Sequence, residues 1–254
     1  MTEALRIIEG AMKFSKAILM WPHPIEAVIF DTDGVLCDSI PLYTKAIEDL
    51  APPPYPDELV IKLNGQIDSV SCQYIADYYH INMSGEELAK LRFERLQKLL
   101  PECPLVPGVE DLVKELKKRN ILLAIGTGSA RPAHELKTIN QKDFFSNFVG
   151  VVCGTEVPHG KPAPDVYLKA RELFTPLNDG KEIPVENILV FEDAYQGIRS
   201  ANLAGMPSVL LHRTKEDIEA GCALANAKPT YIINDFSEFD FSKFEWKSCK
   251  SNIN

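Results

Sequence analysis

The alternation of short apolar runs with helical patterns constrains the fold of this chain more than any other feature of its sequence. Short apolar runs bounded by turn signals are typical of strands that are buried on both faces. Strands alternating with helices imply right-handed crossovers, so we expect an α/β fold with a Rossmann-like parallel sheet that helices cover on both faces. Any site should lie outside the carboxyl ends of the strands. The expected strands are residues 27–30, 121–125, 148–153, 188–191, 208–211 and 231–233, and the helical patterns of this part include 109–119, 165–174 and 194–204.

A helical segment interrupts the alternation after the first expected strand. From about residue 40 to 100 the chain contains helix-like patterns and no strand-like run. Ser84, followed three residues later by Glu87, has the pattern of a capping box that opens a helix. Prolines at 52–54 and between 101 and 107 mark natural breaks, the second being a plausible hinge. We therefore expect an N-terminal extension (1–24), a core (25–39 and 105–254) and an inserted all-helical cap domain (40–104).

Composition and charge restrict the classes of partner. Of the 254 residues, 45% are hydrophobic and 25% are charged, and the formal net charge is -9. A broadly anionic surface disfavours nucleic-acid polymers and acidic membranes, but it allows small anionic metabolites, which respond to local cations and N–H groups. Six scattered cysteines without a CxxC pair favour reduced thiols over a zinc site or a disulfide framework.

The N-terminal segment is the one candidate for targeting. Its apolar run at residues 17–21 is too short to span a bilayer and is followed by two prolines. Residues 1–20 could form an amphipathic helix through Leu5, Ile8, Met12 and Leu19, which we expect to pack on the core. Glu3 and Glu9 argue against a transit peptide. We expect a soluble, cytoplasmic monomer without a membrane partner.

Two acidic residues follow the first expected strand directly. Asp31 and Asp33 stand in the segment FDTDGV, where a charge is costly unless a cation lies nearby. Alternate residues of an extended segment point to the same side, so both carboxylates could share one site. Taken alone, the pair is explained equally well by an Asp-Gly turn or a helix cap.

Three further polar clusters follow the ends of later expected strands. The first is the loop GTGS at residues 126–129, whose hydroxyls and N–H groups could hold a phosphate. The second places Lys161 between a glycine and a proline, and the third is the pair Glu192 and Asp193. Each alone has a structural explanation: a tight turn, a solvated lysine or a helix cap. Together the clusters supply carboxylates for a hard cation, phosphate donors and a lysine, which indicates phosphoryl transfer.

The order of these clusters resembles the four motifs of the haloacid dehalogenase superfamily. The resemblance covers about residues 25–244, and the helical insertion resembles the helical cap domain of that superfamily. One departure is Thr32, where relatives often carry a bulky apolar residue, and we expect its side chain to turn away from the site. The positions that match the motifs are Asp31-Thr32-Asp33, Thr127, Lys161 and Glu192-Asp193.

The resemblance implies a Mg²⁺-dependent phosphatase of a small phosphorylated metabolite. Asp31 would attack phosphorus and form an aspartyl-phosphate, and Asp33 would act as the acid and then the base. The metal ligands so implied are Asp31, the Asp33 carbonyl and Asp193, with Glu192 close by. The groups that would hold the phosphate are Thr127, Gly128, Ser129 and Lys161.

The longer stretches HGKPAPDVYL and VFEDAYQGIRSANLAGM resemble most closely the phosphatases of pseudouridine 5'-phosphate, while relatives of similar pattern hydrolyse glycerol phosphate or hexose phosphates. We expect Asn64 and Gln66 in the insertion, with Arg131 beside the phosphate loop, to contact the leaving group. The alternative is that residues 64–66 form an ordinary turn and Arg131 is solvated. Two other functions stay open. One is a phosphomutase of the β-phosphoglucomutase type, although such mutases carry a histidine where this chain places Tyr43; the other is a non-catalytic regulatory module.

Overall fold

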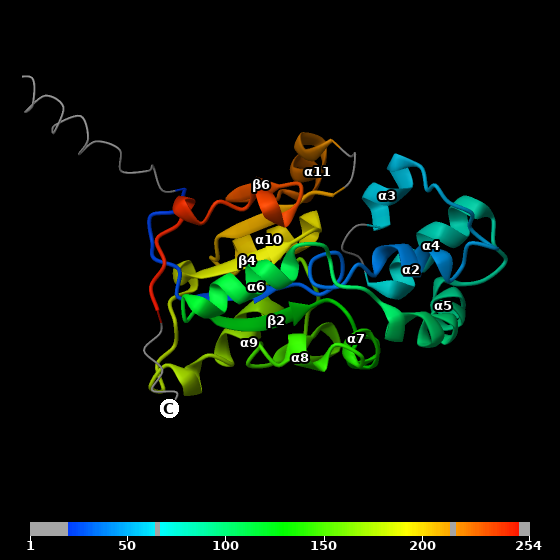
Figure 1. Ribbon diagram of the computed structural model, residues 1–254. Coiled ribbons are helices and arrows are strands. Elements are labelled where there is room, and N and C mark those ends of the chain that lie inside the picture. The colour runs from blue at the N-terminus through cyan, green and yellow to red at the C-terminus, as the bar shows by residue number, and fades with distance from the viewer. Residues whose placement is uncertain (1–19, 64–66, 214–216, 249–254) are drawn as a thin grey trace, which may run out of the picture.

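A computed structural model describes residues 20–63, 67–213 and 217–248 (Figure 1). Its strands form one parallel sheet in the order β3-β2-β1-β4-β5-β6, which confirms the expected α/β fold. Every expected strand is present, but the third begins at Val151 instead of residue 148, because Phe148 packs edge-on against Phe30 in the preceding loop. The strands are β1 (Ala27–Phe30), β2 (Leu122–Thr127), β3 (Val151–Cys153), β4 (Ile188–Glu192), β5 (Ser208–Leu211) and β6 (Tyr231–Ile233).

Helices cover both faces of the sheet, as the alternation in sequence predicted. Side chains of β1 point alternately to the two faces. One set, which includes Phe30, packs beneath α6 (Val109–Lys118), and the other, which includes Ile29, packs beneath α9 (Asp165–Glu172). Full burial of each such apolar side chain contributes about 1.5–3 kcal/mol. The central strand β1 is therefore fixed from both sides, and so is the loop that follows it.

Four further helices belong to the core. α10 (Tyr195–Leu203) contacts β4 and β5 and lies on the same face of the sheet as α9. α7 (Arg131–Thr138) follows the loop after β2, and the short helix α8 (Lys142–Phe145) leads towards β3. α11 (Ile218–Ala225) packs against α10.

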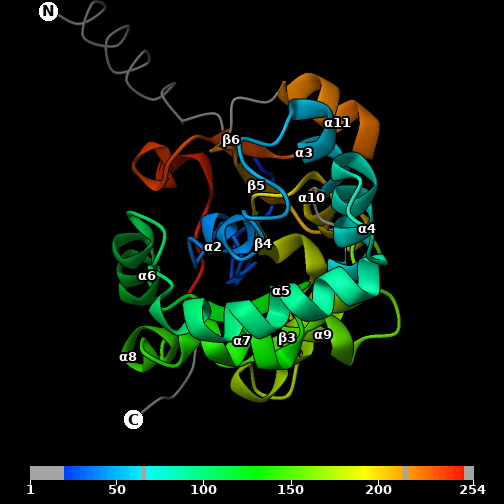
Figure 2. The ribbon, with the colours of Figure 1, turned by 90° about the vertical axis from the view of Figure 1, so that its right-hand side faces the viewer.

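Between β1 and α6 the described residues form helices and no strand, and these helices lie together at one end of the sheet (Figure 1). Figure 2, which views that end, shows α2 in front of the central strands and α5 crossing below it. Ser84 opens α5 as predicted: its hydroxyl accepts a hydrogen bond from the Glu87 N–H at 3.2 Å, and the Glu87 carboxylate accepts one from the Ser84 N–H at 2.8 Å. The helices are α2 (Ile40–Lys45), α3 (Asp57–Leu63), α4 (Asp68–Tyr79) and α5 (Gly85–Leu99).

The two linkers of the insertion pair with each other beside the carboxyl end of β1. The N–H of Asp38 donates to the carbonyl of Pro104 at 2.9 Å, and the N–H of Val106 donates to the carbonyl of Leu36 at 2.9 Å. The insertion therefore leaves and rejoins the core at one place. Its exact boundaries at residues 40 and 104 stay a prediction.

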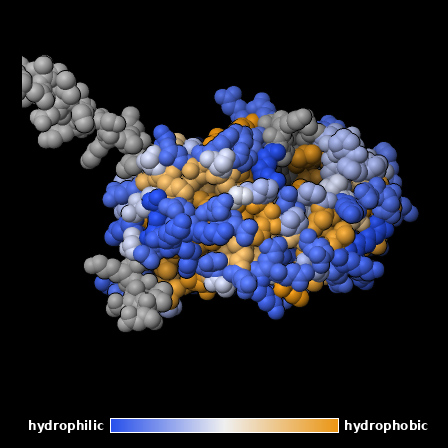
Figure 3. All heavy atoms as spheres, viewed as in Figure 1, coloured by the Kyte–Doolittle hydropathy of each residue, from blue (hydrophilic) through white to orange (hydrophobic). Residues whose placement is uncertain are grey.

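The visible surface in Figure 3 is mainly polar, with apolar patches between the polar ones. In the parts of the chain that the structure describes, no helix is long and apolar enough to cross a bilayer. The five cysteines in those parts are free thiols. The amphipathic helix expected over residues 1–20 lies almost entirely outside the described residues.

Candidate active site

Asp31 and Asp33 lie in the loop that leaves the carboxyl end of β1. The N–H of Asp31 donates to the carbonyl of Phe191 at 2.9 Å, which extends the pairing of β1 with β4 by one residue. Gly34 follows with a φ of +71°, a conformation that glycine adopts without steric cost, and it turns the chain away from the strand. The end of β1 is thereby set beside the end of β4, which carries Glu192 and Asp193.

Lys161 joins these two strand ends. Its Nζ lies 2.6 Å from Oδ1 of Asp31 and 2.6 Å from Oε1 of Glu192. The side chains of Lys161 and Asp31 are only 6% and 8% exposed, so this ion pair is shielded from water. Although burial disfavours an ammonium ion, the two carboxylates outweigh it and raise the pKa of Lys161 above its ordinary value. The sequence placed these residues on separate strand ends, and the structure brings them together.

Glu192 is fully engaged by protein donors. One of its oxygens accepts from the Tyr167 hydroxyl at 2.7 Å in addition to Lys161, and the other accepts from the N–H groups of Asp193 and Ala194, each at 3.0 Å. Gly197 on α10 leaves room for this carboxylate, because a Cβ there would lie 1.7 Å from Oε1 of Glu192. Glu192 therefore acts mainly as a fixed negative charge that orients its neighbours.

Asp193 completes a cluster of carboxylates suited to a hard cation. One oxygen from each of Asp31, Glu192 and Asp193 lies within 4.8 Å of the others. Burial, with the charges of Glu192 and Asp33, raises the pKa of Asp31 to about 7, and burial with Glu192 and Asp31 raises the pKa of Asp193 well above its ordinary value. Carboxylates crowded in this way are stabilised in their ionised form by a cation.

The charges of the site fit a divalent ion. Two buried ammonium groups face four carboxylates, so two negative charges are unmatched within the described part of the site. No donor among the described side chains is hydrogen-bonded to the Asp193 carboxylate, whereas both oxygens of Glu192 are occupied. Mg²⁺ takes carboxylate and carbonyl oxygens, and this donor set suits it. The carboxylates are Asp31, Asp33, Glu192 and Asp193, and the ammonium groups are Lys137 and Lys161.

Asp33 has a separate set of partners. Its carboxylate accepts from the Ser39 hydroxyl at 2.5 Å, from the Ser129 hydroxyl at 2.6 Å, and from Lys137 Nζ at 2.6 Å to each oxygen. Burial alone would raise the pKa of Asp33, but Lys137 and the two hydroxyls outweigh it and lower that pKa. Asp33 is thus held as a carboxylate by three donors, while Asp31 is paired with Lys161.

Lys137 and Ser39 are site residues that the sequence analysis did not single out. Lys137 lies four residues after Ala133 on the buried face of α7, and a lysine in such a stripe is the signal that could have drawn attention to it. Ser39 precedes α2 as an ordinary cap residue would, but its hydroxyl makes no cap bond and donates to Asp33 instead. Lys137 is distant from Asp33 in the chain, so the sequence gives no sign of their contact. Ser39 has a more common local explanation as a helix cap, which conceals its contact with Asp33.

The GTGS loop at residues 126–129, which is predicted to bind phosphate, lies at the end of β2, next to β1. Thr127 is fully buried, and its Oγ1 accepts from the Ser129 N–H at 3.2 Å, which closes the loop tightly. Gly128 between them is exposed. The Thr32 hydroxyl contacts Nδ1 of His134 at 3.4 Å, so its side chain is directed towards α7, in line with the expectation for this departure from the family pattern.

The predicted specificity residues fall into two groups. Asn64 and Gln66 lie outside the described residues. Arg131 begins α7 and forms a bidentate ion pair with Glu156, in which Nε and Nη2 each donate to a carboxylate oxygen at 2.8 Å. Nη2 also donates to the Val151 carbonyl at 3.1 Å. This pairing directs Arg131 to the β3 side of the loop. Its contact with a leaving group stays a prediction.

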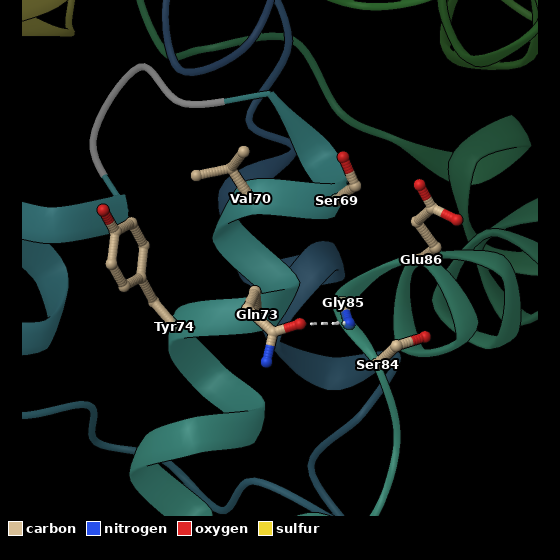
Figure 4. Close-up of a pocket in the computed structure, with 7 residues that line it drawn as sticks. All are labelled: Ser69, Val70, Gln73, Tyr74, Ser84, Gly85 and Glu86. Carbon is tan, nitrogen blue, oxygen red and sulfur yellow. Dashed lines mark hydrogen bonds between the residues drawn. The ribbon is translucent and has the colours of Figure 1, made fainter.

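A cavity of about 440 Å³ lies within the insertion, away from the carboxylates. Figure 4 shows Gln73 of α4 and the N–H of Gly85 at the start of α5 facing each other across one side of it, joined by a hydrogen bond of 2.7 Å. The remaining lining residues are Ser69, Val70, Tyr74, Ser84 and Glu86. Among the described residues that line this cavity none is cationic, so they offer no counter-charge for a phosphate.

Known proteins resemble this chain in sequence and in fold. The family model of haloacid dehalogenase-like hydrolases matches residues 25–205. A Drosophila melanogaster protein named "Probable pseudouridine-5'-phosphatase" is 33% identical over 214 residues, covering 79% of this chain and 90% of that protein. The "(DL)-glycerol-3-phosphatase 2" of Arabidopsis thaliana is 34% identical over 203 residues, covering 76% and 82%. A crystal structure of β-phosphoglucomutase from Clostridium difficile, 23% identical, shares the fold with a TM-score of 0.65 over 85% of this chain and 94% of that one.

The matched region contains all four polar clusters, from Asp31 to Asp193. It also contains the whole helical insertion and every strand up to β4. The residues that form the site and the scaffold around them therefore lie within the matched region. The chain belongs to the haloacid dehalogenase-like hydrolase family.

Proposed function

We propose that this protein is a Mg²⁺-dependent phosphatase of a small phosphomonoester and that it works through an aspartyl-phosphate on Asp31. The observation that carries the proposal is the meeting of Asp31, Lys161 and Asp193 at the ends of two adjacent strands. A nucleophile, a phosphate-binding cation and an unpaired metal ligand there form the minimum set for phosphoryl transfer. The relatives with the same family pattern are named as phosphatases, which supports the same class for this chain.

Asp31 and Asp33 carry out the two chemical steps of this reaction. Asp33 first takes up a proton from solvent. An oxygen of Asp31 then forms a bond to phosphorus as the bond between phosphorus and the leaving oxygen breaks, and Asp33 gives its proton to that oxygen. Water then attacks phosphorus, Asp33 accepts its proton, and the bond between phosphorus and Asp31 breaks to release inorganic phosphate. Mg²⁺, held by Asp31, the Asp33 carbonyl and Asp193, would draw negative charge from the phosphoryl oxygens.

Lys161 and the GTGS loop hold the transferred phosphoryl group in this scheme. An ammonium group has three N–H donors, and Lys161 uses two of them on Asp31 and Glu192, which leaves one for a phosphate oxygen. In this scheme the Thr127 hydroxyl and the Gly128 N–H donate to the phosphate at the end of the neighbouring strand, and Ser129 can join them only by giving up its bonds to Asp33 and Thr127. The helical insertion would cover this end of the sheet as a cap and contact the leaving group.

The substrate we propose is pseudouridine 5'-phosphate or a related nucleotide, sugar or polyol phosphate. The relatives named for pseudouridine-5'-phosphate and glycerol-3-phosphate support this range. As phosphomonoesters, these two compounds differ only in the group that leaves the phosphorus. The mutase alternative is supported by solved structures named as β-phosphoglucomutases, one of them 28% identical to this chain, but α2 carries Tyr43 at the position where the family resemblance implies a histidine in the mutases.

A screen for phosphate release tests the proposal. The purified chain is incubated with nucleoside, hexose, hexitol and glycerol phosphates, with Mg²⁺ or with excess EDTA. We expect release from at least one ester with Mg²⁺ and none with EDTA or with Asp31→Asn. Absence of release from every ester would favour a regulatory module, whereas isomerisation of a hexose phosphate without release would favour the mutase.

A further inference from the structure

Lys137 is a cation of the site that lies outside the four family motifs. It stands on α7, its side chain is fully buried, and the ring of Tyr43 from α2 lies 5.8 Å from its Nζ. Burial of an unpaired ammonium group is costly, so a lysine in this position is explained by its partners. Those partners are Asp33 and Ser129.

We propose that Lys137 is a positioning residue that fixes the carboxylate of Asp33 for its acid and base steps. The inference rests on the proposed function, because it assigns Lys137 a part in the phosphatase reaction of Asp33. Nζ lies 2.6 Å from each oxygen of Asp33 and 2.8 Å from Oγ of Ser129. In the described site Lys161 is paired with Asp31 and Glu192, so Lys137 is the cation that faces Asp33.

The hydrogen bonds of Lys137 distinguish it from a phosphate ligand. Its three N–H donors have three acceptors, namely both oxygens of Asp33 and the hydroxyl of Ser129. No donor is left for a substrate oxygen, in contrast to Lys161. Ser129 accepts from Lys137 and donates to Asp33, so the three residues form a closed triangle.

Donors from two parts of the molecule hold Asp33. Lys137 and Ser129 lie on α7 and the loop before it, whereas Ser39 lies directly before α2, the first helix of the insertion, and donates to the same carboxylate at 2.5 Å. Loss of Lys137 would leave two neutral hydroxyls on Asp33. Lys137 supplies two of the four hydrogen bonds to Asp33 and also the opposite charge beside it, so the orientation of the carboxylate should suffer most from this loss.

The leaving group provides the test. General acid catalysis contributes ~10²–10⁴-fold where the leaving oxygen needs a proton, and p-nitrophenolate leaves without one. Lys137→Met keeps the side-chain length but removes the donors. We expect it to lower kcat/KM for an alkyl phosphate at least about tenfold more than kcat/KM for p-nitrophenyl phosphate. The matched control is Lys169→Met on α9, whose ammonium group bonds the Glu156 carbonyl at the surface, and it should leave both values unchanged.

A double-mutant cycle separates positioning from direct binding. In the Asp33→Asn background, Lys137→Met should cause no further loss of kcat/KM for the alkyl phosphate, because the group that it positions has already been disabled. Equal losses for the two esters, or losses that multiply in the double variant, would overturn the proposal. Both outcomes require that the wild-type protein hydrolyses the esters, and an inactive wild type would instead defeat the proposed function.

Folding is checked by circular dichroism and thermal melting. Lys137→Met leaves the charge of Asp33 buried without its partner, which is strongly destabilising, whereas removal of both charges is tolerated better. If the single variant does not fold, the comparison is between Asp33→Asn and the double variant. Equal kcat/KM values for these two support the positioning role, and a further loss in the double variant contradicts it.

Discussion

Gly34 and Asp193 lie so close together that a Cβ on Gly34 would stand 1.9 Å from Oδ2 of Asp193. Gly34 also has a φ of +71°, which favours glycine. The loops after β1 and β4 meet at this contact. The absence of a side chain at residue 34 therefore determines where the proposed metal ligand can lie.

Gly34→Ala should weaken Mg²⁺ binding. The new methyl group displaces the Asp193 carboxylate, so we expect the Mg²⁺ concentration for half-maximal activity to rise at least about tenfold, the scale seen when the support of a metal ligand is lost. The control is Gly180→Ala, which has a similar φ of +73° but open space around it. The control should lose some stability and keep the Mg²⁺ requirement of the wild type. Equal Mg²⁺ requirements in the two variants would show that the contact does not govern the metal site.

Replacement of the metal is the second test. We expect excess EDTA to stop phosphate release and Mg²⁺ to restore it, because two negative charges of the site are otherwise unmatched. Ca²⁺ should not substitute, since it prefers more ligands at longer distances and would misplace Asp31. Phosphate release is measured with each ion at saturating substrate. Robust turnover in EDTA would rule out the metal requirement.

Mg²⁺ affinity should depend on pH in a predictable direction. The pKa of Asp31 is raised to about 7, so the metal-free protein holds a proton there below that pH, and Mg²⁺ must displace it. We expect the Kd for Mg²⁺, measured by titration calorimetry, to be about tenfold weaker at pH 6 than at pH 8, as one competing proton requires.

The same shift affects stability without metal. The folded protein retains the Asp31 proton up to about pH 7, whereas the unfolded chain loses it near 3.8. The contribution of Asp31 to stability is therefore fully present below pH 3.8 and is lost as the pH rises through about 7. Asp31→Asn should remove this part of the pH dependence in thermal melts without metal. A Kd for Mg²⁺ that is constant between pH 6 and pH 8 would contradict the raised pKa of Asp31, on which both predictions depend.

Substrate ranking tests the specificity prediction. If Gln66 and Arg131 contact the leaving group, changing either to Ala should alter the relative kcat/KM values of nucleotide, sugar and polyol phosphates. The ion pair of Arg131 with Glu156 offers a second variant, because Glu156→Gln weakens that pair without removing the guanidinium group. An unchanged ranking in both Ala variants would place the specificity determinants elsewhere in the insertion.

The sheet and the acidic ends of its strands could be predicted from the sequence because each has a local signal. Strands buried on both faces are continuous apolar runs, and carboxylates directly after them are costly enough to indicate a cation. The starting point of β3 was less predictable, since Phe148 is as apolar as a strand residue but packs from a loop. Periodicity cannot distinguish these two uses of an aromatic side chain.

The support of Asp33 was not predictable for a different reason. Lys137 is 104 positions away in the chain, and its role follows from the orientation of α7. The ion pair of Arg131 with Glu156 likewise depends on how α7 is oriented towards the segment after β3. Such contacts arise from tertiary packing, and the sequence has no local pattern for them.

Trapping the intermediate shows whether Asp31 carries the phosphoryl group. Asp33→Asn lacks the base for the second step but not the nucleophile, so with Mg²⁺ and p-nitrophenyl phosphate it should accumulate the phosphorylated enzyme. The reaction is quenched in acid within milliseconds to seconds, and the modified peptide is identified by mass spectrometry, with Asp31→Asn as the control. We predict a phosphoryl group on Asp31 in Asp33→Asn and none in the control. Release of phosphate by wild-type enzyme without any phosphorylated Asp31, in either the wild type or Asp33→Asn, would contradict the covalent mechanism.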